Sequence, residues 1–491
     1  MKRRTHAFSF LLLAVFITCA VIQFLAAGDI RALMLDTDAL NIPTVVDNVI
    51  AHHGSLSHWY LSPAPYLFPD ALIHSVIHPF ASSTYMRLAV FAAVQIALLF
   101  LALWWLAVRT LRNHPLAIAV AVTGNFTWMA LLRGSPYNQL MTAGFHYGAF
   151  LMSIAVIALA VGTTRRINWA VIGIVCFLTT LNDNIFVIQT TIPLVLMLFL
   201  VAIFDAEHRM YRLVVASVAA LSTLIGSVAY GVVITHQTRY PVHLNGEKFR
   251  ANAHAVRSIV SEFLRHHEPI AIALLFTAVI AAHFFIRLVK RIRRTTSMAM
   301  LALFACASMV STCVGLVLAT TNEMTIRYFI PVFSWPVIIG GLVIFNTDMI
   351  REKVPVIVAS VTALMLCLNT STLVDLHGID RDYYPAEIAC IDTALPTGRA
   401  LHGIANYWDA KYIQSFSKRD LTVAQYWDNL TPMKWITTDD YYRSSYDFAV
   451  ISTTAAPQFL LSRELIMNTY GEPSSSSTCG TRIVLFYKQG E

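Results

Sequence analysis

Charged residues are scarce in this chain. Only 13% of its 491 residues are Asp, Glu, Lys or Arg, whereas a soluble globular domain carries about 25%. Hydrophobic residues make up 57% of the chain, and its mean hydropathy is +0.61. A chain with this composition cannot use water as its main solvent, so an ordinary soluble protein is excluded.

Several other sequence signatures are missing as well. The seven cysteines include no CxxC pair and no Cys/His spacing of the zinc-binding type. No Gly-rich phosphate loop follows a predicted strand, so the sequence shows no fingerprint for binding a sugar nucleotide. The chain also shows no internal repeat of the kind found in many transporters.

Apolar runs long enough to cross a bilayer recur along most of the chain. They begin near Phe8, Leu88, Leu116, Tyr147, Trp169, Ile185, Leu213, Ile270, Met298, Tyr328 and Val354. The first run follows Lys2-Arg3-Arg4 and is longer than a signal-peptide core, so we interpret it as an uncleaved first helix. The sequence therefore predicts a polytopic α-helical membrane protein with about eleven transmembrane helices.

The basic residues predict the orientation of these helices. With the N-terminus inside, the short inside segments hold 16 of the 35 Lys and Arg residues, and 24 of the 28 acidic residues fall outside. Short basic loops stay in the cytoplasm, which favours an N-in, C-out protein of the inner (plasma) membrane with its active face extracytoplasmic. The net charge of +7 then belongs to the inner surface. It suits contact with anionic membrane lipids rather than with nucleic acid.

The chain divides into two predicted domains. Residues 1–371 form a multi-span domain with a large first outside loop, 29–86, and residues 372–491 form a small extracytoplasmic domain that holds 14 of the 28 acidic residues. The alternation of its apolar residues predicts an α/β domain with strands at 399–406, 421–426, 447–453 and 482–487, and helices at 409–416 and 458–470. Cys390 and Cys479 are its only cysteines, and its compartment is oxidising, so we predict that they form a disulfide.

Two carboxylates, Asp36 and Asp38, follow the first span closely and should lie near the membrane surface. Carboxylates there can act as a general base, or they can hold a divalent cation such as Mg²⁺ or Mn²⁺ that carries a phosphate. An Asp-x-Asp sequence is also typical of a solvated loop start, so both interpretations stay open.

The rest of this loop carries further polar and aromatic candidates. The apolar stripe of residues 42–50 predicts a short amphipathic helix in the membrane interface. Asp70, His74 and His78 recur every four residues and would share a helix face, which suggests either a metal site or hydrogen-bonded surface groups. Trp59 and neighbouring aromatic residues could anchor the loop at the headgroups or stack on a sugar ring.

Four residues lie where spans meet the outer surface. They are Arg133, Asp183, Arg327 and Tyr328. Charges at such boundaries often only anchor helices, but a polar group held between spans is costly unless it is paired. The planar guanidinium of an arginine also matches the oxygens of a lipid phosphate.

These features together resemble the GT-C superfamily of membrane glycosyltransferases. The layout is similar over most of the chain, Arg327-Tyr328-Phe-Ile-Pro331 resembles the R-Y-x-x-P run of many bacterial members, and Asn182-Asp183 resembles their short acidic turn. In one respect the chain departs from the pattern: many members have adjacent Asp-Glu in the first loop, whereas Thr37 separates the acids here.

The resemblance implies an inverting glycosyltransferase that takes sugar from a polyprenyl-phosphate donor to an envelope glycan or lipid acceptor. It implies that Asp36 or Asp38 is the catalytic base or metal ligand. Residues that would bind substrate are then Arg133, Asp183, Arg327, Tyr328 and Asp70. One alternative is a lipid or polysaccharide transporter, which would place charges at the midplane of the bilayer. Another is a scaffold whose tail, residues 372–491, binds an envelope partner.

Overall fold

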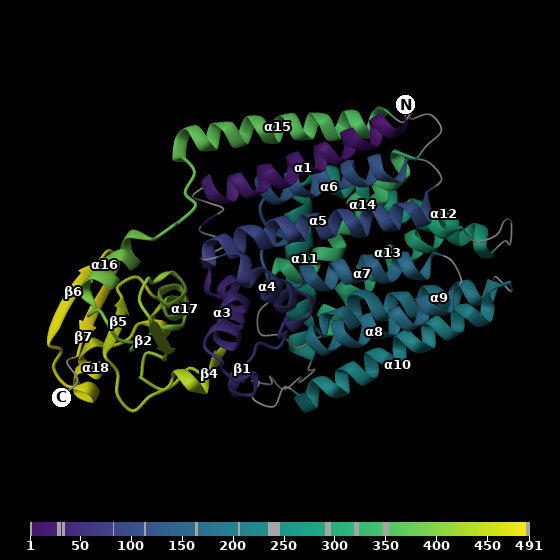
Figure 1. Cartoon of the computed structure of the whole chain (residues 1–491). Coiled ribbons are helices and arrows are strands. Elements are labelled where there is room, and N and C mark those ends of the chain that lie inside the picture. Colours follow the sequence, from purple (N-terminus) through teal and green to yellow (C-terminus); the bar gives the residue numbers. More distant parts are fainter. Residues whose placement is uncertain are drawn as a thin grey trace. The chain divides into compact units, whose positions relative to one another are not determined.

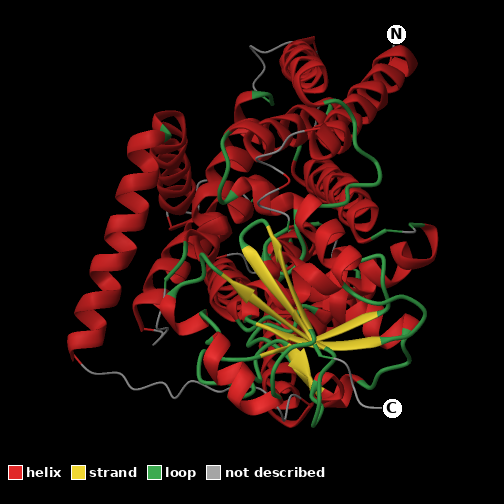
Figure 2. Cartoon of the chain, turned by 90° about the vertical axis from the view of Figure 1, so that its left-hand side faces the viewer, coloured by secondary structure: helices red, strands yellow, loops and turns green. Residues whose placement is uncertain are grey.

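The computed structural model describes residues 2–26, 31, 35–81, 83–111, 114–162, 165–204, 207–233, 246–289, 296–318, 324–346 and 353–487. Helices dominate the structure, and its strands gather in one region (Figure 2). The chain splits into two compact units. Of the described residues, unit 1 contains those within 1–23, 92–233 and 239–376, and unit 2 contains those within 24–91 and 377–491.

Unit 1 is built from helices, which Figure 1 labels in chain order. They are α1 (Lys2–Ala26), α5 (Thr84–Thr110), α6 (Pro115–Leu132), α7 (Tyr147–Ala160), α8 (Arg166–Asn182), α9 (Ile192–Phe204), α10 (Arg209–Val233), α11 (Gly246–His266), α12 (Glu268–Val289), α13 (Ser297–Leu318), α14 (Ile330–Ile344) and α15 (Lys353–His377). The first residues of α5 and the last residues of α1 and α15 belong to unit 2.

Eight helices among the described residues are long and apolar enough to cross a membrane. They are Arg4–Ala26, Thr84–Thr110, Pro115–Leu132, Val187–Phe204, Arg209–Val232, Ser297–Leu318, Ile326–Ile344 and Lys353–His377. A bent pair, Gly246–His266 and Pro269–His283, would make nine if it counts as one span. The sequence predicted about eleven. All eleven apolar runs are helical, but α7 and α8 contain only 14 and 17 residues, fewer than the roughly 20 that a bilayer requires.

Close packing of small residues holds the helices of unit 1 together. A Cβ atom at Gly124 of α6 would lie 2.5 Å from the Phe16 ring of α1, so a larger residue there would push the two helices apart. Of the 18 residues of α6, 13 are buried. In an apolar solvent such fit, rather than the hydrophobic effect, drives the association of helices.

Unit 2 contains a five-stranded sheet with the order β3-β2-β5-β7-β6. Strands β3, β2 and β5 are parallel, and β7 and β6 run antiparallel to their neighbours. Its elements are α3 (Thr37–Ala51), β1 (Trp59–Tyr60), α4 (Leu72–Ile77), α16 (Ala386–Ala394), β2 (Leu401–Ala405), α17 (Tyr407–Phe416), β3 (Leu421–Gln425), β4 (Thr437–Thr438), β5 (Phe448–Ser452), α18 (Arg463–Tyr470), β6 (Ser475–Cys479) and β7 (Arg482–Phe486).

The tail therefore has the α/β structure that the sequence predicted. The four predicted strands correspond to β2, β3, β5 and β7, and the first predicted helix corresponds to α17. The second predicted helix begins later than expected, at Arg463, because Ser462 caps it by accepting a hydrogen bond from the Leu465 amide. Strand β6 was not predicted, since its serine-rich sequence has little strand propensity.

The first outside loop is part of unit 2 and not of the helical unit to which the sequence analysis assigned it. Strand β1 pairs with β4 of the tail. Val45, Trp59 and Leu61 of the loop share one apolar core with tail residues such as Ile404. Helix α3 packs against α17, so protein covers much of the apolar stripe that was expected to lie in the membrane interface.

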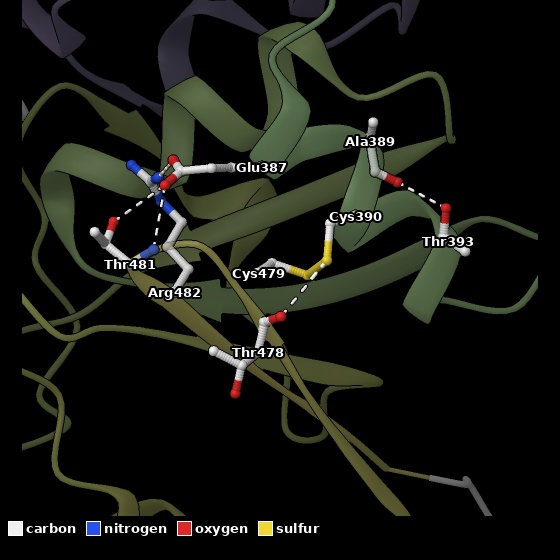
Figure 3. The surroundings of a disulfide bond; sticks show 8 residues. All are labelled: Glu387, Ala389, Cys390, Thr393, Thr478, Cys479, Thr481 and Arg482. Atoms are coloured by element: carbon white, nitrogen blue, oxygen red, sulfur yellow. Dashed lines mark hydrogen bonds and ion pairs between the residues drawn. A yellow bond between two sulfur atoms is a disulfide. The ribbon is translucent and has the colours of Figure 1, made fainter.

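A disulfide joins Cys390 of α16 to Cys479 of β6, which is the pairing that the sequence suggested (Figure 3). Beside it, the Arg482 guanidinium donates to the Glu387 carboxylate, and the Thr481 amide donates to Glu387 at 3.2 Å. The bond closes a loop with a sequence separation of 89. It links the beginning of the tail to its end.

Replacing both cysteines, Cys390→Ser with Cys479→Ser, should destabilise unit 2. The chain-entropy model gives a loss of about 4 to 5 kcal/mol for a loop of this length. Urea unfolding of the full chain in detergent, followed by tryptophan fluorescence, measures the change. A matched control is Cys306→Ser with Cys313→Ser, two free cysteines of α13. An unfolding midpoint equal to that of the control would show that the bond contributes no stability.

Candidate functional site

Asp36 is fixed at the beginning of α3. It is the N-cap residue of that helix, and its Oδ1 accepts a hydrogen bond of 2.8 Å from the Asp38 amide. Aspartate is favoured there because a helix begins with unsatisfied N–H groups and a partial positive charge. Thr37 is buried, and its hydroxyl donates to the Trp408 carbonyl at 2.8 Å. The Asp36 carboxylate is exposed.

Asp38 has a different environment. It is half-buried, and its Oδ1 accepts a hydrogen bond of 2.5 Å from the Tyr407 hydroxyl. Burial raises the pKa of Tyr407 well above its ordinary value, and the nearby Asp38 and Asp36 carboxylates add to this shift. The tyrosine therefore keeps its proton and stays a donor. The two carboxylates that the sequence could not tell apart thus differ in exposure and in partner.

Lys411 lies one helical turn after Tyr407 in α17. It is only 4% exposed, its Nζ lies 4.6 Å from the centre of the Tyr407 ring, and it is 3.4 Å from the Gln425 Oε1. Burial lowers the pKa of Lys411 from 10.5 to about 7, although Asp38 and Asp36 act in the opposite direction. A lysine in this state titrates near neutral pH.

A cavity of about 490 Å³ opens beside Asp36. Aromatic and charged side chains dominate its lining, which comprises Arg31, Leu35, Asp36, Thr37, Tyr383, Trp408, Tyr412 and Arg482. Trp408 is 44% exposed, and the Arg31 guanidinium lies 4.2 Å from the centre of the Tyr383 ring. Polar groups beside exposed aromatic faces are the usual lining of a small-molecule site.

Ion pairs hold Arg482, one of the residues that line this cavity, in place. The Arg482 Nε lies 2.8 Å from the Asp409 Oδ1 and the guanidinium also contacts Glu387. Burial raises the pKa of Asp409 to about 6, and its hydrogen bond from Asn406 works against that shift. Because its charge is balanced by two carboxylates, Arg482 contributes shape and hydrogen-bond donors more than net charge.

Tyr407, Trp408 and Lys411 were missed by the sequence analysis. They lie in the first half of α17, the helix that follows β2, a parallel strand of the sheet. Ligands of parallel α/β sheets bind at the carboxyl ends of the strands. The polar and aromatic sequence after the predicted strand at 399–406 was the available signal.

Unit 1 contains a second polar cluster. Asp183 caps the end of α8, and its Oδ2 lies 2.7 Å from the Nδ1 of His146; both side chains are buried. The Tyr328 ring centre is 5.3 Å from that of His146, and the Arg327 guanidinium lies over the Phe145 and Tyr328 rings. The structure therefore brings the predicted Asp183, Arg327 and Tyr328 together with a histidine that the sequence analysis did not identify.

His146 adopts a positive φ of 67° at the start of α7. Such a backbone conformation is costly for a residue other than glycine and is often found at functional sites. The local sequence does not identify His146 as a site residue, because the histidine directly precedes an apolar run.

The other predicted site residues lie elsewhere. Arg133 is exposed at the C-terminal end of α6. Asp70 is 1% exposed, so a substrate could reach its carboxylate only if the surrounding chain moved. His78 lies 3.1 Å from the Asp47 carboxylate. His74 stacks on Phe91, and burial lowers the pKa of His74 to about 3.

The predicted metal sites gain no support from this geometry. Within the described part of the chain, no group of three or more His, Cys, Asp or Glu side chains is arranged to hold a metal ion. The Asp36 and Asp38 carboxylates already accept hydrogen bonds from an amide and a tyrosine hydroxyl. These two residues alone do not form a protein-built cage for Mg²⁺ or Mn²⁺.

No protein-family model matches the sequence, and no curated protein matches it. Among solved structures, the chain is similar to the oligosaccharyltransferase of Archaeoglobus fulgidus in complex with zinc and sulfate, with a TM-score of 0.40, 12% identity, and coverage of 90% of this chain and 68% of that one.

Lys411→Met should stabilise the protein, and the gain should depend on pH. An unfolded lysine keeps a pKa near 10.5, whereas folded Lys411 has a pKa of about 7. Between these values the unfolded state binds more protons, so wild-type stability rises with pH across this window. We expect the variant's advantage to shrink by on the order of 3 kcal/mol from pH 7 to pH 9.5.

Urea unfolding in detergent at both pH values measures this change. The control is Lys434→Met, which removes an exposed lysine paired with Asp439. An advantage of Lys411→Met that is the same at pH 7 and pH 9.5 would contradict the titration of a buried lysine.

Proposed function

We propose that this protein is a membrane glycosyltransferase of the GT-C type. It would transfer a sugar, with inversion, from a polyprenyl-phosphate donor to an envelope glycan or lipid acceptor on the extracytoplasmic face of the inner membrane. The observation that carries this proposal is the cavity beside Asp36, where an exposed carboxylate lies with Trp408 and Tyr412. A sugar ring offers apolar C–H faces to aromatic rings and hydroxyl groups to a carboxylate.

Asp36 is the proposed general base. It would take the proton from the acceptor hydroxyl while the hydroxyl oxygen attacks the anomeric carbon of the donor sugar. The bond between that carbon and the phosphate oxygen breaks on the opposite face, so the configuration inverts and the polyprenyl phosphate leaves as an anion. Positioned proton transfer of this kind is typically worth roughly a hundred- to ten-thousand-fold in rate.

Asp38 is the proposed positioning residue. Its carboxylate already accepts a short hydrogen bond from Tyr407. Together with the bond from Thr37 to the Trp408 carbonyl, it would fix the start of α3 against α17. We therefore assign the base to Asp36 and the support of its geometry to Asp38.

The polar cluster of unit 1 is proposed as a separate site for a phosphate group. The planar fork of Arg327 matches two phosphate oxygens, and Asp183 would hold His146 in one tautomer and orientation. Arg133 is the second candidate for phosphate. Charged side chains inside the membrane cost free energy, and those that occur there usually have a function. We derive no step through a metal ion, because the described carboxylates do not form a cage for one.

Asp36→Asn should abolish transfer, with a rate loss of roughly a hundred-fold or more, whereas Asp38→Asn should lower the rate less. Asparagine caps a helix as well as aspartate does, so Asp36→Asn keeps the start of α3 while removing the base. The assay follows sugar transfer in proteoliposomes that contain lipid extract of the host membrane as donor and acceptor source, with mass spectrometry of the products.

Asp439→Asn is the matched control, since it removes an exposed carboxylate of unit 2 that pairs with Lys434. It should transfer at the wild-type rate. A folded Asp36→Asn protein that also transfers at that rate would show that the base lies elsewhere.

A further inference from the structure

Two cysteines near opposite ends of the sequence lie in contact inside unit 1. The Sγ of Cys19 in α1 is 3.8 Å from the Sγ of Cys367 in α15. About one turn further along both helices, the Gln23 side chain donates to the Thr370 hydroxyl at 2.8 Å. Figure 1 shows α1 and α15 side by side. The two thiols are thus held together by a polar contact next to them.

The two cysteines also differ in access. Cys19 is buried, whereas Cys367 is exposed on the outside of the helices. Cys19 lies seven residues before the end of α1 at Ala26, a distance of roughly 10 Å along a helix. The pair therefore lies within the apolar length of both spans, where lipid-soluble reagents can reach Cys367 and water-soluble proteins cannot.

We propose that Cys19 and Cys367 form a second, reversible disulfide, oxidised by a quinone-class compound dissolved in the membrane. Both S–H bonds break and one S–S bond forms. The two protons and two electrons released pass to the quinone, which becomes a quinol. A disulfide needs its sulfur atoms about 2 Å apart, so the atoms must approach by roughly 2 Å, which side-chain rotation and a small helix shift supply.

A bond between Cys19 and Cys367 would join the two helices that lead into unit 2. Helix α1 leads into residues 24–91 and α15 leads into residues 377–491, and these two stretches make up most of unit 2. A bond between the two helices would hold α1 and α15 together near the ends that lead into these stretches. This inference is independent of the proposed glycosyl transfer, because it depends only on the two thiols and their helices.

The test counts free thiols in the full chain. The chain has seven cysteines, and two are already bonded in unit 2. Proteoliposomes are treated with a fully substituted benzoquinone, which cannot be alkylated by a thiol, and the protein is then denatured with N-ethylmaleimide and weighed intact without reduction. We expect five adducts before oxidation and three after, and a tryptic digest should contain a peptide pair joined through Cys19 and Cys367. Three adducts in the protein as isolated, with five after mild reduction, would support the same bond.

Single variants serve as controls. Cys19→Ser and Cys367→Ser should each give four adducts before and after quinone, because the remaining thiol has no partner. Cys306→Ser with Cys313→Ser should still lose two adducts on oxidation. The proposal is overturned if wild-type protein keeps five adducts after quinone, or if either single variant loses as many as wild type.

Discussion

The hydrogen bond from Tyr407 to Asp38 joins two segments that are 369 residues apart in the sequence. It stands beside the bond from Thr37 to the Trp408 carbonyl and the pairing of β1 with β4. These contacts make the first outside loop and the tail one folded unit, with a shared apolar core. The cavity exists only because of this union, since its lining comes from both segments.

Burial then decides what each polar group in that unit can do. Asp36 stays exposed, whereas Asp38 and Tyr407 are tied to each other, and Lys411 is enclosed next to them with a pKa near 7. Burying an ammonium group away from water costs free energy. A core with no other role than packing would avoid this cost by having an apolar side chain in place of Lys411. In unit 1, burying the polar side chains of Asp183 and His146, which are hydrogen-bonded to each other, likewise costs free energy that apolar side chains would avoid.

Much of this organisation could be predicted from local sequence. Long apolar runs mark helices because the bilayer sets their length, and alternating apolar residues identified β2, β3, β5 and β7. Strand β6 was not predictable from Ser475 to Ser477, because it is a strand through its pairing with β7. The apolar stripe of α3 predicted a helix but not its partner, since a helix period is the same whether lipid or protein covers it. The burial of Lys411 and the contact of His146 with Asp183 could not be predicted, because burial and contact depend on chain segments distant in sequence.

The proposed function is that the protein adds a sugar to an extracytoplasmic acceptor. The most direct measurement is mass spectrometry of envelope glycans and glycolipids from cells with and without this protein. If the proposal holds, one class of envelope molecule should become lighter by a single sugar residue when the protein is missing, while the polyprenyl-phosphate sugar accumulates. Envelope molecules of unchanged mass in cells without the protein, with or without a change in the membrane leaflet they occupy, would contradict it.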